Sequence, residues 1–212
     1  MKFNALFFDF DGVILDSVDV KTEAFAQMFR FYGQEVEKEV VEYHLANGGV
    51  SRFEKFCYYY DKLLKIPITD EKLALLGKEF SALVVQKVID SPFVPGAESC
   101  LRSAQKEGIP CYIVSGTPEE EIRIIVSSKN LGHFFKEVHG SPRQKDLIVA
   151  DILMRKQYKA DQCLFIGDAL SDYDAAQKNS LRFLGIVKNS EDSPFPVGTA
   201  ISPKVTVPSI SG

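Results

Sequence analysis

Apolar residues between positions 17 and 91 recur every three or four residues, which is the spacing of one face of a helix. Four helices are expected there. Their limits, read from capping residues, glycines and prolines, are Ser17 to Gly33, 35–46, 53 to Pro67 and Thr69 to Pro92. The apolar stripes of these helices indicate core packing, so the segment is interpreted as an all-helical unit.

After Pro92 short apolar runs alternate with amphipathic segments. The expected strands are 109–114, 135–139, 163–166 and 183–187, and the expected helices are 97–106, 118–130, 144–156 and 172–178. Such alternation predicts a parallel sheet with helices on both faces and with function at the carboxyl ends of its strands. The predicted fold is α/β, with a Rossmann-like, doubly wound parallel sheet core and a small inserted all-helical cap domain.

The expected division of the chain follows from these patterns. Residues 1–16 supply the first core strand and its loop, residues 17–91 form the helical cap, and residues 92–212 form the rest of the core. Hinges are expected around Asp16-Ser17 and at 91–96. The tail from Lys188 is poorly patterned and either completes an edge of the sheet or stays mobile.

Composition narrows the function classes. The 212 residues are 45% hydrophobic, with a net charge of -4 and a pI of about 5.5. This balance gives no basic footprint for nucleic acid or an acidic membrane, and no apolar stretch approaches the roughly 18 residues of a transmembrane helix. The four cysteines are scattered, and the start of the chain has no signal-peptide pattern, so a cytoplasmic location is expected. The oligomeric state stays open.

Asp9 and Asp11 follow an apolar run and precede Gly12, which allows a sharp exit from the strand. Strand alternation alone would point both carboxylates the same way. Two carboxylates this close raise each other's pKa unless a cation lies between them. The pair therefore indicates either a bound metal or a shared proton.

Three later segments also carry polar groups where a strand gives way to a loop. In Ser115-Gly116-Thr117, Thr117 is expected to cap a helix with Pro118 and Glu120, forming an anion site or simply a well-capped helix. Lys145, early in the next helix, can pair with Asp9 or neutralise a phosphate oxygen. The third segment is Gly167-Asp168-x-x-x-Asp172, whose carboxylates lie one helical turn apart and suit Mg²⁺.

The order Asp-x-Asp, Ser-Gly-Thr, Lys, Gly-Asp-x-x-x-Asp resembles the haloacid dehalogenase superfamily of phosphohydrolases, over essentially the whole chain. The resemblance implies a Mg²⁺-dependent phosphomonoesterase that acts on a small phosphorylated metabolite through an aspartyl phosphate. Because Asp11 is retained, the resemblance argues against carbon-halogen chemistry.

The same resemblance implies roles for individual residues. Asp9 resembles the nucleophile, Asp11 the general acid and base, and Lys145 the lysine that stabilises charge. Ser115 and the Gly116 N–H resemble phosphate ligands. The implied metal ligands are Asp9, the backbone carbonyl of Asp11, Asp168 and Asp172.

Substrate choice is expected to lie in the cap, where Gly49-Val50-Ser51-Arg52 is similar to a cap loop of β-phosphoglucomutases. In those enzymes such an arginine holds the non-transferring phosphate, so Arg52 is a candidate substrate ligand; a surface arginine is the alternative. Lys21 stands where these mutases carry histidine, and Gly167 where they carry glutamate. Both differences favour a phosphatase.

Two alternatives stay open. One is a phosphosugar mutase that uses the same aspartyl phosphate. The other is a noncatalytic phosphoacceptor or phosphometabolite-binding protein similar to a receiver domain, which also uses acids, a hydroxyl and a lysine around Mg²⁺. Receiver domains lack a helical cap and order their motifs differently.

Overall fold

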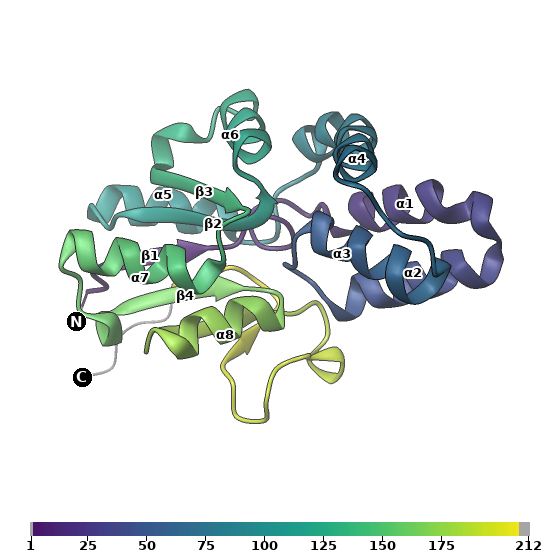
Figure 1. Cartoon of the computed structure of the whole chain (residues 1–212). Coiled ribbons are helices and arrows are strands. Elements are labelled where there is room, and N and C mark those ends of the chain that lie inside the picture. Colours follow the sequence, from purple (N-terminus) through teal and green to yellow (C-terminus); the bar gives the residue numbers. More distant parts are fainter. Residues whose placement is uncertain (1, 208–212) are drawn as a thin grey trace.

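The computed structural model describes residues 2–207 and contains one six-stranded sheet in which every pair of neighbours is parallel (Figure 1). The strands are β1 (Ala5–Phe8), β2 (Cys111–Pro118), β3 (Phe135–Ser141), β4 (Cys163–Gly167), β5 (Arg182–Ile186) and β6 (Ile201–Ser202). Their order is β3-β2-β1-β4-β5-β6. The order reverses direction beside β1, and such a switch point is where open α/β sheets bind ligands. The predicted α/β fold is confirmed.

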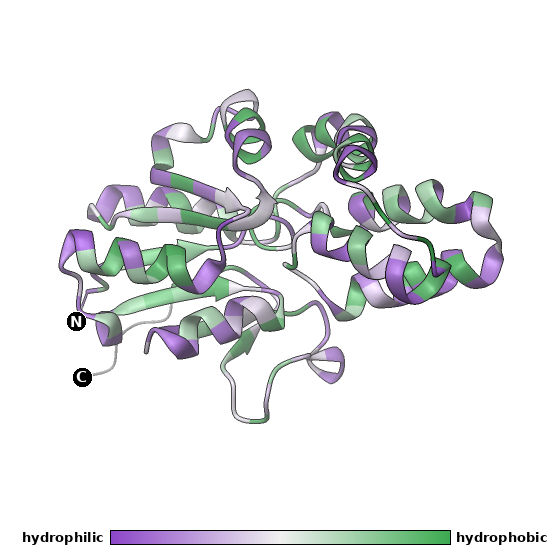
Figure 2. Cartoon of the chain, in the orientation of Figure 1, coloured by the Kyte–Doolittle hydropathy of each residue, from purple (hydrophilic) through white to green (hydrophobic). Residues whose placement is uncertain are grey.

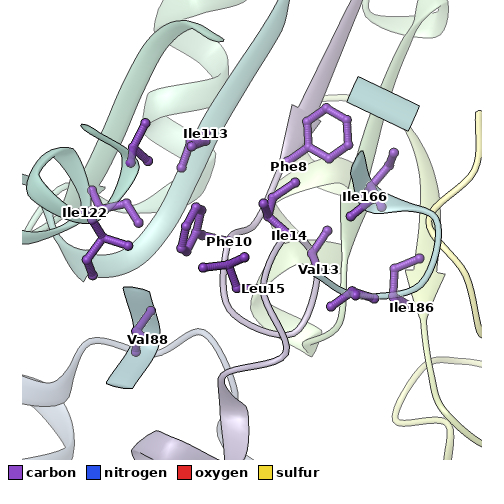
Figure 3. Packing of buried hydrophobic residues seen from close by; sticks show 14 of the residues in the cluster. Phe8, Phe10, Val13, Ile14, Leu15, Val88, Ile113, Ile122, Ile166 and Ile186 are labelled. Carbon is purple, nitrogen blue, oxygen red and sulfur yellow. The ribbon is translucent and has the colours of Figure 1, made fainter. Parts of the chain in front are cut away.

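The two faces of the sheet bury different residues because side chains alternate along each strand. In β1, Leu6 and Phe8 join one apolar cluster, whereas Ala5 and Phe7 join another. Figure 3 shows Phe8 and its neighbours in the first cluster. The helices beside the strands are α5 (Ala97–Glu107), α6 (Glu119–Ser128), α7 (Lys145–Lys156) and α8 (Leu170–Lys178). Residues of α5 and α6 lie in the first cluster and residues of α7 and α8 in the second, so both faces are covered.

Between β1 and α5 the chain is helical and lies beyond one end of the sheet (Figure 1). The elements are α1 (Val18–Phe29), η1 (Arg30–Tyr32), α2 (Gln34–Ala46), α3 (Arg52–Tyr58), the π-helix η2 (Tyr59–Leu64) and α4 (Asp70–Asp90). We call residues 18–90 the helical insertion. Its apolar faces turn inward while polar faces remain outside (Figure 2). Phe25, Phe56 and Phe80 pack against one another at its centre. Thr69 caps α4 by accepting a hydrogen bond from the Lys72 N–H, as predicted.

Two predicted helix caps are wrong, for the same physical reason. Ser17 precedes α1, but its side chain does not cap the helix. The segment 115–118 continues β2 instead of opening a helix, and α6 begins after Pro118 with no side-chain cap. The hydroxyls of Ser17 and Thr117 both donate to Asp11, 2.6 and 3.0 Å away. Each hydroxyl is oriented toward this part-buried carboxylate and does not accept a first-turn N–H as an N-cap side chain would.

The shorter helices are η3 (Gly132–Phe134), η4 (Ala160–Gln162) and η5 (Ser190–Asp192). The tail contributes β6, which pairs with β5 and so completes one edge of the sheet. All four cysteines are free thiols. Among residues 2–207, no helix combines the length and the apolar character needed to cross a membrane.

Candidate active site

Asp9 lies immediately after β1, where the backbone leaves the sheet. Its side chain is 5% exposed, and its Oδ2 lies 3.1 Å from the Lys145 ammonium. Its other oxygen, Oδ1, is buried and has no hydrogen-bond partner within the described part of the chain. A buried carboxylate oxygen without a partner is costly, so this atom is available to a ligand.

Lys145, the first residue of α7, lies between two carboxylates. Its Nζ donates to Asp172 Oδ1 at 2.6 Å and also contacts Asp9. Burial alone would lower the pKa of Lys145, but the charges of Asp172 and Asp9 outweigh burial and raise it. Lys145 is therefore a cation, and it supplies a fixed positive charge beside Asp9.

Asp9, Asp168 and Asp172 form an acidic cluster at the carboxyl ends of β1 and β4. One oxygen from each lies within 4.8 Å of the others. Burial, followed by the charges of Asp9 and Asp172, raises the pKa of Asp168 well above its usual value. Burial also raises the pKa of Asp172 to about 7, although Lys145 opposes that shift. Both shifts favour the protonated forms, so the three carboxylates resist full ionisation beside Lys145 alone.

This acidic cluster fits a hard divalent cation. Its donors are carboxylate oxygens, which Mg²⁺ prefers, and Asp9 Oδ1 is an unpartnered buried acceptor among the described residues. Two glycines make room for the cluster. A Cβ at Gly12 would overlap the Asp168 carboxylate, and one at Gly167 would overlap the Asp172 side chain. Gly12 also has a positive φ of 78°, which favours glycine in any case.

The carboxylate of Asp11 points to a different set of partners from Asp9. β1 ends at Phe8, so strand alternation does not extend to either acid. Lys21 of α1 forms an ion pair with Asp11 Oδ2, and Lys21 Nζ also donates to Thr117 Oγ1 at 2.7 Å. Burial raises the pKa of Asp11, but Lys21 and the hydroxyls outweigh burial and lower it. Asp11 is therefore ionised, and it joins the helical insertion to the core.

Ser115 and Gly116 lie in β2. They line a cavity of about 140 Å³ that Asp9, Asp11 and Asp168 also line. Ser115 is 1% exposed, and its Oγ accepts a hydrogen bond from the Thr117 N–H. The loop after α2 approaches closely, because a Cβ at Gly116 would overlap the carbonyl oxygen of Gly49. The helical insertion thus covers this cavity directly.

Arg52 also lines the cavity, but its guanidinium is already paired. Nη1 donates to Glu121 Oε2 and to Ser81 Oγ, each at 2.9 Å, while Nη2 contacts Glu121 Oε1. Glu121 belongs to α6 of the core, so this bidentate pair crosses from the insertion to the core. The cavity therefore gains little net positive charge from Arg52.

Several residues of the site were not selected by sequence reasoning. Ser17, Lys21 and Thr117 surround Asp11, and His44 and Lys55 line the cavity from the insertion. The usable signal for Lys55 is its place among apolar residues of a short helix, next to buried Phe56. His44 carries no comparable signal, since it lies alone at the end of α2.

A family model for haloacid dehalogenase-like hydrolases matches residues 3–179, which include every strand-end residue described above. The chain belongs to this family. A phosphoglycolate phosphatase from Pseudomonas savastanoi pv. phaseolicola is 28% identical over 177 residues, covering 80% of this chain and 64% of that protein. The chain therefore spans slightly less than two thirds of the length of that relative.

Solved structures agree with the fold of this haloacid dehalogenase-like chain. β-Phosphoglucomutase from Clostridium difficile has a TM-score of 0.73 at 19% identity, covering 90% of this chain and 86% of that one. A predicted phosphatase from Clostridium acetobutylicum has the same TM-score at 18% identity, covering 95% and 94% of the two chains. At these identities the similarity concerns the fold alone.

Proposed function

We propose that the protein is a Mg²⁺-dependent phosphomonoesterase that acts on a small phosphorylated metabolite through an aspartyl phosphate on Asp9. The observation that carries the proposal is the state of the Asp9 carboxylate. One oxygen is held 3.1 Å from Lys145, and the other is buried, unpartnered within residues 2–207, and next to Asp168 and Asp172. A carboxylate in this setting is oriented and has one oxygen free to attack phosphorus.

Asp9, Asp168 and Asp172 would hold the metal, together with the backbone carbonyl of Asp11 that the family resemblance adds. When bound, Mg²⁺ neutralises negative charge on the phosphoryl oxygens and on the surrounding carboxylates. Lys145 contributes a second positive charge, and its contact with Asp172 keeps the ammonium in place. Together these charges reduce the repulsion between Asp9 and an anionic substrate.

In the first step an Asp9 oxygen forms a bond to phosphorus as the bond from phosphorus to the alcohol oxygen breaks. Asp11 gives its proton to the departing alkoxide. Asp11 is ionised in the free protein, but the negative charge of an incoming phosphoryl group raises its pKa and favours uptake of the proton. The products of this step are the alcohol and the aspartyl phosphate.

In the second step Asp11 accepts a proton from water, and the water oxygen attacks phosphorus and releases Asp9. Inorganic phosphate leaves and the Asp9 carboxylate is regenerated, while Asp11 ends this step protonated and either serves the next substrate or returns its proton to solvent. Lys21, Ser17 and Thr117 hold the Asp11 carboxylate by three contacts, which fixes its direction for both proton transfers. Ser115 and the Gly116 N–H are the proposed ligands of the phosphoryl oxygens.

Two observations favour hydrolysis over mutase chemistry. The phosphoglycolate phosphatases that resemble this chain in sequence are hydrolases by name, whereas the mutase likeness is one of fold. Arg52, the proposed ligand of a second phosphate, is already balanced by Glu121. A substrate with one phosphoryl group therefore matches the available charge better than a bisphosphate does.

The test is phosphate release from p-nitrophenyl phosphate, measured with Mg²⁺ and with EDTA. We expect turnover that requires Mg²⁺, and a loss of about 10³-fold or more in the Asp9→Asn variant. A noncatalytic binding protein would release no phosphate under either condition. A mutase would interconvert sugar phosphates with little net release.

A further inference from the structure

Lys55 of α3 differs from the other cations around the cavity. Each of the others holds a carboxylate: Lys21 holds Asp11, Arg52 holds Glu121, and Lys145 holds Asp9 and Asp172. Lys55 is 1% exposed, and the acceptors of its ammonium are the Nδ1 of His44 at 2.8 Å and the His44 carbonyl at 3.3 Å. Both acceptors are neutral, so the charge of Lys55 is not balanced locally.

The hydrogen bond from Lys55 determines the tautomer of His44. When Lys55 is protonated its ammonium only donates, so His44 Nδ1 is the acceptor and the ring proton lies on Nε2. Burial, followed by the charge of Lys55, lowers the pKa of His44 to about 3, so the ring is neutral. The Nε2 atom is buried and lacks a hydrogen-bond partner among residues 2–207. His44 therefore offers an unused N–H beside an unbalanced ammonium.

Both side chains line the cavity that contains Asp9, Asp11 and Ser115. Phe25 and Phe80 also line it, and apolar walls strengthen any charge interaction inside because they exclude water. The cavity has a volume of about 140 Å³. This space accommodates a short molecule that reaches from the acids to the insertion.

We propose that Lys55 and His44 bind the carboxylate of a short phosphorylated carboxylic acid whose phosphoryl group lies at Asp9. The inference rests on the proposed phosphatase function and names its substrate class. Two donors, one ammonium and one imidazole N–H, match the two oxygens of a carboxylate. Their single net charge matches a monoanion rather than a second phosphoryl group.

The carboxylate of the proposed substrate supplies the negative charge that Lys55 lacks in the free site. Burial, together with the charges of Lys21 and Lys145, lowers the pKa of Lys55 to about 7, while Asp168 opposes this shift. A bound carboxylate compensates for the buried ammonium and gives a partner to His44 Nε2. A neutral hydroxyl at the same place satisfies the hydrogen bonds without balancing the charge.

The experiment compares kcat/KM for 2-phosphoglycolate with kcat/KM for 2-hydroxyethyl phosphate, which carries a hydroxyl in place of the carboxylate. We expect the wild type to prefer the acid, and the ratio of the two values to fall roughly 10- to 100-fold in Lys55→Met. Lys38→Met, an exposed lysine of the same insertion, should keep the wild-type ratio. Equal losses on both substrates in Lys55→Met would mean a structural role and would overturn the proposal.

A binding measurement separates this proposal from the proposed function and does not depend on a folded Lys55 variant. Calorimetric titration of the Asp9→Asn protein with each compound in Mg²⁺ should give at least tenfold tighter binding of 2-phosphoglycolate. Equal affinities would overturn the carboxylate site. If the acid binds more tightly but the wild type releases no phosphate from it or from p-nitrophenyl phosphate, the proposed hydrolysis fails and the carboxylate site stands.

Discussion

Arg52 of α3 and Glu121 of α6 form a buried bidentate ion pair that joins the helical insertion to the sheet core, with Nη1 2.9 Å from Oε2. The side chains are 4% and 9% exposed, and Ser81 of α4 contacts both. A charge removed from such a pair leaves its partner buried and uncompensated. The pair therefore holds the insertion closed over the cavity.

Removing one partner should destabilise the protein strongly. We expect Glu121→Met to lower the free energy of unfolding by about 3–5 kcal/mol, and the double variant Arg52→Met with Glu121→Met to regain most of that loss. Urea unfolding of the two single variants and the double variant measures this. Additive losses in the double variant would show that the two residues are not coupled.

The close contact between the insertion and β2 should be disrupted by one methyl group added at Gly116. A Cβ at Gly116 would overlap the Gly49 carbonyl oxygen, so Gly116→Ala should displace the loop after α2. We expect kcat/KM for p-nitrophenyl phosphate to fall by up to about 10²-fold. Gly132→Ala is the matched control, because a Cβ at Gly132 would meet no other atom of residues 2–207 within 4 Å beyond its chain neighbours. Equal kinetics in the two variants would contradict a closed insertion.

The lowered pKa of Lys55 predicts a pH dependence of stability. In the unfolded chain the lysine keeps its ordinary pKa of 10.5, whereas in the folded protein the value is about 7. Between pH 7 and pH 8.5 the unfolded state therefore binds more protons at Lys55, and this contribution makes the free energy of unfolding rise with pH. Asp172, whose folded pKa is about 7, contributes in the opposite direction, so the effect of Lys55 is the difference between the wild type and a Lys55 variant. His44 is neutral in both states across this window, since its folded pKa of about 3 and its ordinary value of 6.5 lie below it.

Urea unfolding at several pH values between 7 and 8.5 measures how the free energy of unfolding changes with pH. The change in the free energy of unfolding with pH should be less positive in Lys55→Met than in the wild type, whereas Lys38→Met, which removes an exposed lysine, should keep the wild-type slope. The same slope in wild type and Lys55→Met would argue that Lys55 is fully protonated throughout the window.

Divalent metal should stabilise the folded protein through the acidic cluster. Mg²⁺ at 100 times its dissociation constant contributes about 2.7 kcal/mol by mass action, a rise in Tm of roughly 5–10 °C for a chain of this size. Asp168→Asn should lose most of this rise, because it removes a ligand from the cluster. Glu191→Gln, an exposed acid elsewhere, should keep it. Thermal unfolding in Mg²⁺ and in EDTA measures this rise in Tm. An unchanged rise in Asp168→Asn would show that the metal binds at another site.

The sequence predicts the arrangement of the acids well because the sheet does the positioning. Asp9 and Asp168 follow β1 and β4, which are adjacent and parallel, so their side chains meet at one edge. Asp172 joins them because it lies in the first turn of the helix after β4. Strand patterns and motif spacing are local signals, and here they are sufficient.

Contacts that depend on how the insertion packs could not be predicted in the same way. Local rules assigned Ser17 and Thr117 to helix caps, but both hydroxyls donate to Asp11. The pair of Lys55 and His44 arises where α2 and α3 meet, and no sequence spacing encodes that contact. Arg52 was selected for its charge, whereas its partner lies 69 residues away in α6.

The central claim is that Asp9 becomes phosphorylated. In Asp11→Asn, p-nitrophenyl phosphate should still form the intermediate, because p-nitrophenolate departs without protonation, but hydrolysis should slow for lack of a base. The reaction is run with Mg²⁺ and quenched with acid. Mass spectrometry of the peptide that contains Asp9 then measures the phosphorylated enzyme directly. We expect one added phosphoryl group on Asp9 and none in the Asp9→Asn protein. Phosphate release that persists in Asp9→Asn, or a phosphoryl group on another residue, would contradict it.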